Sequence, residues 1–260
     1  VVDLDPASGS YSQIVHRVEF PYLGDEVHHF GWNACSSALC PSSAHPHLER
    51  RYLIVPTLRS SRLYIIDTKP DPLRPQLVKT ISAEEVASRA GYSRLHTVHC
   101  GPDAIYVNAM GSTNDGQGPG GVFMLDHYNF EVLGKWEIDR GPQTFAYDFW
   151  WHINHDRMIT SEWGTPNMVE GGLQPDLLLD GQYGHRLHFW NLRDRKHIQS
   201  VDLGKEHQIT LELRPAHDPT KVAGTTPEYI AAVAVAVQNE LELLLEEEAA
   251  AVRKFRAGRS

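Results

Sequence analysis

The sequence predicts an all-β fold: a partial β-propeller with about three to four blades visible, followed by a C-terminal α-helix. Short strand-like segments bounded by Gly, Pro, Asn and Asp recur along the chain. They repeat about every 60 residues, more than the roughly 40–50 of a common blade, because each copy carries an insertion. Histidine-rich segments recur at the same position of the repeat. A β-sandwich also has short, evenly spaced strands, but it gives no reason for that recurrence.

The expected strands fall into groups of three. Two segments open the chain, at 1–5 and 12–20. The groups are 51–58, 63–67 and 76–81; 103–110, 121–126 and 131–138; and 157–163, 185–191 and 196–203. Since a propeller blade has four strands, one more must precede each group. These innermost strands are expected at 28–33, 96–100 and 147–154, with 208–217 opening a fourth copy.

The segments between strands are expected as insertions. Ser82 begins a helix over 82–90, and Glu85 stands where it would complete a capping box. The segments 111–121 and 164–184 are expected as loops. From 229 to 255 Ala, Leu and Glu predominate and basic residues end the run, which favours a helix. The sequence therefore divides into a partial propeller, 1–223, and a helical tail, 224–260.

Composition restricts the partners. The formal net charge of −9 argues against nucleic-acid binding, because a phosphate-binding surface needs an excess of Lys and Arg. No run is apolar and long enough for a membrane span. A partial propeller exposes a sheet edge and a blade face, so we expect the tail to cover that face or two copies to associate. We expect a cytoplasmic location, or a periplasmic one if a signal segment precedes Val1.

Four histidines in the inner segments are the metal-ligand candidates: His28, His29, His96 and His99. The first strand of each propeller blade borders the central channel, so these side chains would converge there. Imidazole nitrogen suits copper, zinc, iron or nickel. On a regular strand His28 and His29 point to opposite faces, as do His96 and His99. A bulge or turn is needed to bring either pair together.

The remaining histidines rank below these four. His155 and His217 come next as ligand candidates, followed by His152, His185 and His188. We expect five others to be solvated loop or edge residues, namely His45, His47, His127, His197 and His207.

Acidic, aromatic and sulfur-containing residues complete the candidate site. Asp25 and Glu26 are candidates to orient imidazoles. Four tryptophans are expected in the core, where they could also wall the channel: Trp32, Trp150, Trp151 and Trp163. The three cysteines are too few for a disulfide framework, so we expect free thiols or metal ligands, with a Cys35–Cys40 disulfide as an alternative. Cys35 is the candidate catalytic thiol.

Several motifs resemble one known family. They are Asp25–Cys35, Leu95–Cys100, Gly120–Asp126, Tyr147–Trp150, Met158–Trp163 and Ala216–Pro219. Together they resemble the selenium-binding protein family, also known as methanethiol oxidase. The resemblance covers about residues 1–223 and would correspond to roughly the N-terminal half of a family member; 225–260 does not share it.

The resemblance implies copper held by the four candidate histidines, with the Cys35 thiol nearby. It also implies oxidation of methanethiol by oxygen to formaldehyde, hydrogen sulfide and hydrogen peroxide, so that a small volatile thiol and oxygen would be the partners. A chain without the later blades is expected to lack any ligands they contribute. The alternative is therefore a non-catalytic propeller module that binds metal, selenium, thiol species or a protein partner. Animal family members have a selenium-associated Cys after a Tyr in the opening hairpin, where this chain has Ser12.

Overall fold

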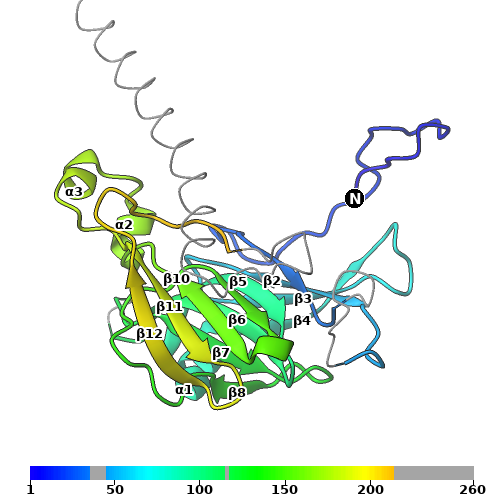
Figure 1. The fold of residues 1–260 in the computed structure, drawn as a ribbon. Helices are drawn as coiled ribbons and strands as arrows, with labels where there is room; N and C mark the ends of the chain where they lie inside the picture. Colours follow the sequence, from blue (N-terminus) through cyan, green and yellow to red (C-terminus); the bar gives the residue numbers. More distant parts are fainter. Residues whose placement is uncertain (36–44, 115–116, 214–260) are drawn as a thin grey trace, which may run out of the picture.

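Residues 1–35, 45–114 and 117–213 are described by the structure, a computed structural model, and their strands form three four-stranded antiparallel sheets (Figure 1). The first sheet contains β1 (Gly31–Trp32), β2 (Tyr52–Pro56), β3 (Leu63–Asp67) and β4 (Gln76–Ile81). The second contains β5 (Tyr92–Cys100), β6 (Ile105–Ser112), β7 (Gly121–Leu125) and β8 (Val132–Lys135). The third contains β9 (Phe149–His152), β10 (Arg157–Ser161), β11 (Arg186–Asn191) and β12 (Lys196–Asp202). Strands pair in chain order within each sheet, as in a propeller blade, which confirms the predicted partial propeller.

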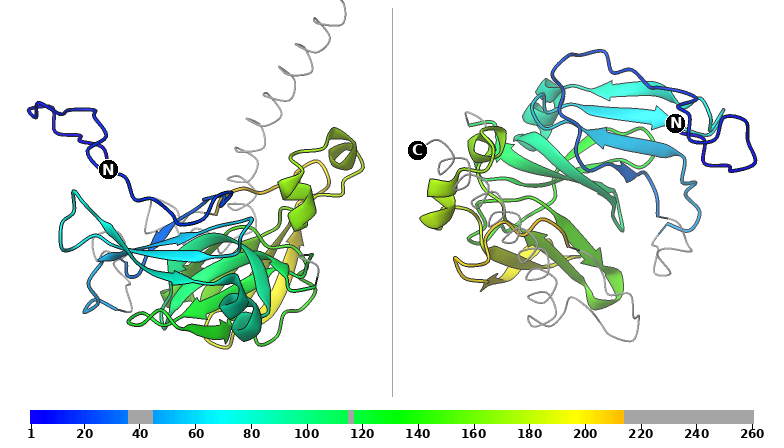
Figure 2. Two further views of the ribbon diagram at one scale, coloured as in Figure 1. Left: turned by 180° about the vertical axis from the view of Figure 1, so that it is seen from behind. Right: turned by 90° about the horizontal axis from the view of Figure 1, so that it is seen from above.

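The two largest hydrophobic clusters lie between neighbouring blades, which Figure 2 shows side by side. Ile54 and Ile65 of the first blade pack in one cluster with Val98 and Phe123 of the second. A second cluster joins the second and third blades through Tyr106, Trp136, Phe149 and Trp190. Alternating strand positions supply these contacts, because successive side chains point to opposite faces of a sheet.

A β-bulge recurs at one position of the repeat. The pairing of the third and fourth strands shifts between Ile65 and Ile66, between Met124 and Leu125, and between Phe189 and Trp190. Each shift comes just before an Asp or Asn at or directly after the end of the third strand, namely Asp67, Asp126 and Asn191. The three sheets are therefore structural repeats in detail, and positions in one can be compared with positions in another.

The opening strands were wrongly predicted. The segments 1–5 and 12–20 share one isolated bridge, Val2 with Ile14, and form no sheet. This end of the chain projects from the blades in Figures 1 and 2, with Leu4 and Ile14 exposed. A two-stranded hairpin with no sheet beside it is marginally stable, which explains the outcome.

The predicted helix at 82–90 is confirmed as α1 (Ala83–Ala90), where Glu85 N donates to Ser82 Oγ at 3.2 Å. Within the expected loop 164–184 the chain instead forms two short helices, α2 (Pro166–Glu170) and α3 (Pro175–Leu179). A short 3-10 helix, Ile153–His155, follows β9. The predicted tail helix, Cys40 and His217 lie outside the described residues. No described helix is long and apolar enough to cross a membrane.

Arg140, Glu137 and Tyr92 form a partly buried hydrogen-bonded group that fastens the beginning of β5, the strand that carries His96. Arg140 donates to Glu137 Oε1 at 2.5 Å and also to the Tyr92 hydroxyl. Burial raises the pKa of Glu137 from 4.5 to about 7, against the opposing effect of Arg140. Between these values the folded state keeps a proton that the unfolded chain has lost.

The Glu137 carboxyl therefore contributes a fall in the free energy of unfolding of at most ~3 kcal/mol as pH rises from 4.5 to about 7, while buried His96 contributes in the opposite direction. Glu137→Gln should remove the Glu137 contribution from the pH dependence, because its side chain does not titrate. Urea unfolding at several pH values measures it, with the exposed Glu131→Gln as the control. An unchanged slope in Glu137→Gln would contradict the assignment.

Candidate functional site

Three of the four predicted ligands meet beside the inner strands of the first two blades. The ring of His96, on β5, lies 4.9 Å from that of His28 and 4.7 Å from that of His29, between ring centroids. His28 and His29 precede β1 and are not in regular strand, so adjacent positions do not force their rings to opposite faces. The break from regular strand that we expected to be necessary for His28 and His29 to lie together is therefore present.

A second irregularity orients β5. Its pairing with β6 shifts between Leu95 and Val98, the signature of a β-bulge. Leu95 and Val98 both pack in the core between the first two blades, although they are three residues apart. His96 and His99 both face the third blade's inner segment: His96 contacts Tyr147, and His99 contacts Phe149. The ring contacts of His99 are with Phe149 and Trp150 instead of the other three histidines, so it is the outlying member of the set.

His96 is the most constrained of these residues. It is fully buried, and its Nδ1 lies 3.1 Å from the Tyr147 carbonyl oxygen and 2.9 Å from Thr97 Oγ1. A carbonyl oxygen only accepts, so we assign the ring proton to Nδ1, which leaves a lone pair on Nε2. Within the described residues that buried Nε2 has no hydrogen-bond partner. Burial, reinforced by His29 and His28, lowers the pKa of His96 to about 3, so the ring stays neutral.

His99 has a comparable feature. Its buried Nε2 also lacks a hydrogen-bond partner among the described residues, and the nearest carboxylate oxygen, Asp148 Oδ1, is 3.9 Å away. Asp148 is fully buried, and its other oxygen accepts from Leu213 N at 2.7 Å. Leu213 belongs to the segment predicted to open the fourth copy, and Gln208 to Thr210 of that segment are buried. This segment therefore borders the site.

Glu26 holds His28, as the sequence predicted. His28 Nε2 donates to Glu26 Oε1 at 2.8 Å, and Arg59 Nε donates to Glu26 Oε2 at 2.6 Å. The hydrogen bond from His28, with that from Arg59, lowers the pKa of Glu26 despite partial burial. Arg59 also donates through Nη2 to the Glu170 carbonyl oxygen at 3.3 Å. Asp25 instead accepts from Tyr64 and Arg62, so it orients no imidazole.

The cysteines correct the sequence prediction. Cys35 and Cys100 form a disulfide with Cα atoms 6.0 Å apart, so neither carries a free thiol in this structure. Cys35 follows β1 and Cys100 ends β5, and the bond therefore joins the inner segments of two blades. A thiol nucleophile at Cys35 would require prior reduction. The alternative Cys35–Cys40 pairing is also excluded, because Cys35 is already bonded.

Gly31 explains how closely these segments approach. A Cβ atom at Gly31 would lie 2.3 Å from the Val98 carbonyl oxygen and 2.8 Å from its carbon. Only glycine permits this contact between β1 and β5. His28 and His29 therefore reach His96 partly because residue 31 has no side chain.

Aromatic rings continue outward from His96. Tyr147 lies 4.0 Å from His96, and Trp163 stacks on Tyr147 at 6.2 Å between ring centroids. Trp150 contacts His99 at 4.7 Å. Burial, with Asp148 nearby, raises the pKa of Tyr147 to about 12. Trp150 and Trp163 thus line the site as anticipated, whereas Trp32 stacks with Arg50. Tyr147 and Thr97 were missed because neither stands out by residue type.

Other predicted positions lie elsewhere. His127, expected on the surface, is buried and its Nδ1 lies 2.9 Å from the Asn33 carbonyl oxygen. His152 and His155 contact each other at the third blade. Across the described residues, no group of three or more His, Cys, Asp or Glu is arranged to hold a metal ion. The histidine cluster is therefore a set of candidate ligands and not a formed coordination sphere.

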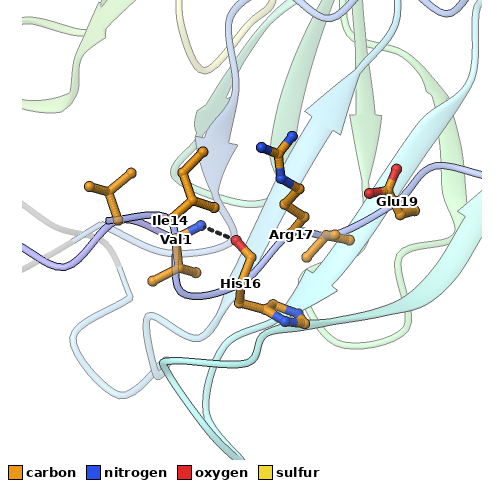
Figure 3. Close-up of a pocket in the computed structure, with 7 residues that line it drawn as sticks. Val1, Ile14, His16, Arg17 and Glu19 are labelled. Carbon is orange, nitrogen blue, oxygen red and sulfur yellow. Dashed lines mark hydrogen bonds between the residues drawn. The ribbon is translucent and has the colours of Figure 1, made fainter. Parts of the chain in front are cut away.

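A pocket of about 350 Å³ lies apart from these residues (Figure 3). Among the described residues its lining comes from 1–19, including Ile14, His16 and Arg17. The N-terminal amine donates to the His16 carbonyl oxygen at 2.7 Å across it. It contains none of the candidate ligands and has no part in the site.

Comparison with known proteins agrees with this architecture. A model of the family described as 56kDa selenium binding protein matches residues 1–250, further than the predicted limit of about residue 223. A methanethiol oxidase from Xenopus laevis is 43% identical over 219 residues, covering 84% of this chain and 45% of that protein. Selenium-binding protein 1 from Arabidopsis thaliana is 39% identical, covering 86% and 45%.

A solved structure supports the fold. A hypothetical selenium-binding protein from Sulfolobus tokodaii superimposes with a TM-score of 0.78 and 62% identity, covering 85% of this chain and 48% of that one. The chain spans about half the length of these relatives. It belongs to the 56kDa selenium binding protein family.

Proposed function

We propose that this chain belongs to a methanethiol oxidase in which copper is held by imidazoles of His28, His29, His96 and His99. One observation carries the proposal: the buried Nε2 of His96, whose proton we assign to Nδ1, has no partner among the described residues and lies beside two more imidazoles. Relatives named methanethiol oxidase, 43% and 42% identical, support the reaction.

The residues present fit copper chemically. Neutral imidazole nitrogen is a preferred copper ligand, and a buried lone pair without a partner is costly unless something binds it. The buried Nε2 of His99 also has no hydrogen-bond partner among the described residues and lies 3.9 Å from Asp148 Oδ1. The hydrogen bonds from His96 to Tyr147 and from His28 to Glu26 fix ring orientation, as partners of ligating histidines do.

Bound copper would supply the one-electron chemistry that connects a thiol with dioxygen. The overall reaction is balanced, since methanethiol, dioxygen and water in equal amounts give formaldehyde, hydrogen sulfide and hydrogen peroxide in the same amounts. The chain's own residues contribute a dry, aromatic approach, because Tyr147, Trp163 and Trp150 flank His96 and His99. Such a wall suits a small apolar thiol.

The alternative is a non-catalytic module that binds metal, selenium, thiol species or a protein partner. The specific observation in its favour is that the chain spans about half the length of its relatives, so ligands from further blades can be needed for turnover. The cytoplasmic location and the self-association expected from the sequence stay predictions.

Metal analysis and peroxide release test the proposal together. The full chain, loaded with copper and freed of excess metal, should bind copper and release hydrogen peroxide when methanethiol is added. His96→Gln should weaken copper binding and lower peroxide release by about 100-fold or more, because it removes the constrained ligand.

His16→Ala is the matched control, because His16 lies on the N-terminal segment and its ring bonds the Pro75 carbonyl oxygen, away from the cluster. Its copper content and activity should equal those of the unchanged chain. Copper binding without peroxide would favour the non-catalytic module. Copper binding that is equal in His96→Gln and the unchanged chain would refute the assignment of the site.

A further inference from the structure

We propose a second, separate metal site on the third blade, formed by His188 Nδ1, His197 Nε2 and Ser200 Oγ, for a divalent first-row transition metal such as zinc. His188 lies on β11, and His197 and Ser200 lie on β12. None of these residues belongs to the histidine cluster described above.

The three atoms already have the spacing of three ligands. His188 Nδ1 is 3.2 Å from His197 Nε2 and 3.0 Å from Ser200 Oγ, and His197 Nε2 is 3.1 Å from Ser200 Oγ. Two nitrogens bound at about 2.0–2.1 Å to a tetrahedral zinc ion lie roughly 3.3 Å apart. A small shift would therefore place all three around one cation.

Hydrogen bonding alone leaves this triangle incomplete. His188 Nε2 lies 2.9 Å from Glu162 Oε1, a carboxylate that only accepts, so that neutral His188 has a lone pair on Nδ1. Only His197 and Ser200 can then supply protons, which makes two protons for three contacts. A metal ion would engage one lone pair from each of the three groups at once.

Glu162 has the position of an outer partner of a metal-bound histidine. It and His188 are both buried, and its second oxygen accepts from Arg186 N at 3.2 Å. In the described part of the chain no Lys or Arg forms an ion pair with Glu162. A cation on the far side of the His188 ring would balance that buried charge and complete a carboxylate–histidine–metal chain.

The backbone brings His197 and Ser200 to the same place. Residues three apart point to opposite faces of a regular strand, but the bulge between Phe189 and Trp190 changes the phase of β12. The His197 ring is held at 5.2 Å from Trp190, edge to face. Gly141 covers its other side so closely that a Cβ there would lie 2.5 Å from the ring. The ring is thus oriented in advance of any metal.

The other blades show that the fold does not require these residues. At the bulge of the third blade, Trp190 pairs with His197. At the equivalent bulges both partners are aliphatic: Ile66 pairs with Leu77 in the first blade, and Leu125 pairs with Val132 in the second. The position two residues before the first member of each pair differs in the same way. It is Tyr64 in the first blade and Phe123 in the second, which both pack in hydrophobic clusters, but His188 in the third. The third blade therefore departs from its own repeat at both histidines.

The site has room for an exchangeable ligand. His197 and Ser200 are only half-buried, so water can reach the metal and fill a fourth position. Two imidazoles, a hydroxyl and water suit zinc, cobalt, nickel or copper better than the hard cations calcium and magnesium. Because the third group is a hydroxyl, the arrangement is distinct from a cluster of His, Cys, Asp and Glu.

Cobalt(II) provides a direct test, since its visible absorption reports low-coordinate nitrogen ligation. The metal-free full chain carrying His96→Gln, which weakens the other candidate site, is titrated with cobalt(II). We expect one equivalent to bind with a visible absorption band. Adding His197→Ala should abolish the band and weaken binding at least tenfold, and Glu162→Gln should weaken binding by about 10–100-fold while the band persists.

His185→Ala is the matched control, because His185 immediately precedes β11, the strand of His188, but bonds Asp202 instead. It should leave affinity and spectrum unchanged. Ser200→Ala provides a second, smaller change if His197→Ala does not fold by circular dichroism. Absence of a bound equivalent, or equal binding in folded His197→Ala or Ser200→Ala and the parent, would overturn the proposal and leave a hydrogen-bonded network. The release of hydrogen peroxide in the copper test does not depend on these outcomes.

Discussion

Replacing both Cys35 and Cys100 with serine is expected to lower the free energy of unfolding by about 4 kcal/mol. The disulfide closes a loop with a sequence separation of 65 residues, and its loss returns that conformational freedom to the unfolded chain. Both cysteines are changed together so that no unpaired thiol remains to react. Urea unfolding of the oxidised protein and the double variant measures the difference.

Cys40→Ser is the control, because it leaves the disulfide intact. It should retain the midpoint of the unchanged protein, while reduction of the unchanged protein should reproduce the double variant. Equal midpoints for oxidised and doubly substituted proteins would show that the bond does not stabilise the fold. The disulfide also means that a catalytic role of Cys35 must be tested separately from its effect on stability, because Cys35 supplies a thiol only in reduced protein.

Gly31→Ala is expected to lower the free energy of unfolding by about 3 kcal/mol, the upper part of the usual range for overpacking. The new methyl group would meet the Val98 backbone, which cannot rotate away as a side chain can. Relief requires β1 and β5 to separate, and this would move His28 and His29 from His96. Copper affinity should therefore fall together with stability.

Gly9→Ala is the matched control, because a Cβ atom at Gly9 meets nothing within 4 Å. Thermal unfolding and copper titration of both variants provide the two measurements. A Gly31→Ala protein with unchanged stability and copper affinity would contradict the close approach of the two inner segments. Loss of stability with full copper affinity would mean that the cluster does not depend on this contact.

Much of the fold was predictable because local patterns determine it. The strand segments 63–67, 76–81 and 121–126 agree with β3, β4 and β7, and the Ser82 cap begins α1 as expected. The order of strands in each sheet followed from the phase of the repeat. The segments 1–5 and 12–20 show the limit, since strand propensity gives no strand without a neighbouring sheet to pair with.

The site was predictable in its members but not in its geometry. His28, His29 and His96 were identified by residue type and by phase, whereas their contact depends on the bulge in β5 and on Gly31. The Cys35–Cys100 bond was missed because a pairing across 65 residues depends on tertiary structure. His197 was assigned to a solvated edge for the same reason: one bulge in β12 changes its surroundings.

The arginine contacts of Glu170 have a consequence for how the insertion is held. Pro166 is the one buried residue of α2, and Arg94 reaches the Glu170 carboxylate at 2.5 Å while Arg59 reaches its carbonyl oxygen. Attachment of α2 thus depends largely on charged, partly exposed groups, whereas hydrophobic clusters fill the contacts between neighbouring blades. Because the Debye length shrinks from about 8 Å at 0.15 M to about 3 Å at 1 M ionic strength, dissolved salt weakens the first kind of contact selectively. We therefore expect high ionic strength to weaken the Arg94–Glu170 and Arg59–Glu26 ion pairs, and with the second the hold of Glu26 on His28.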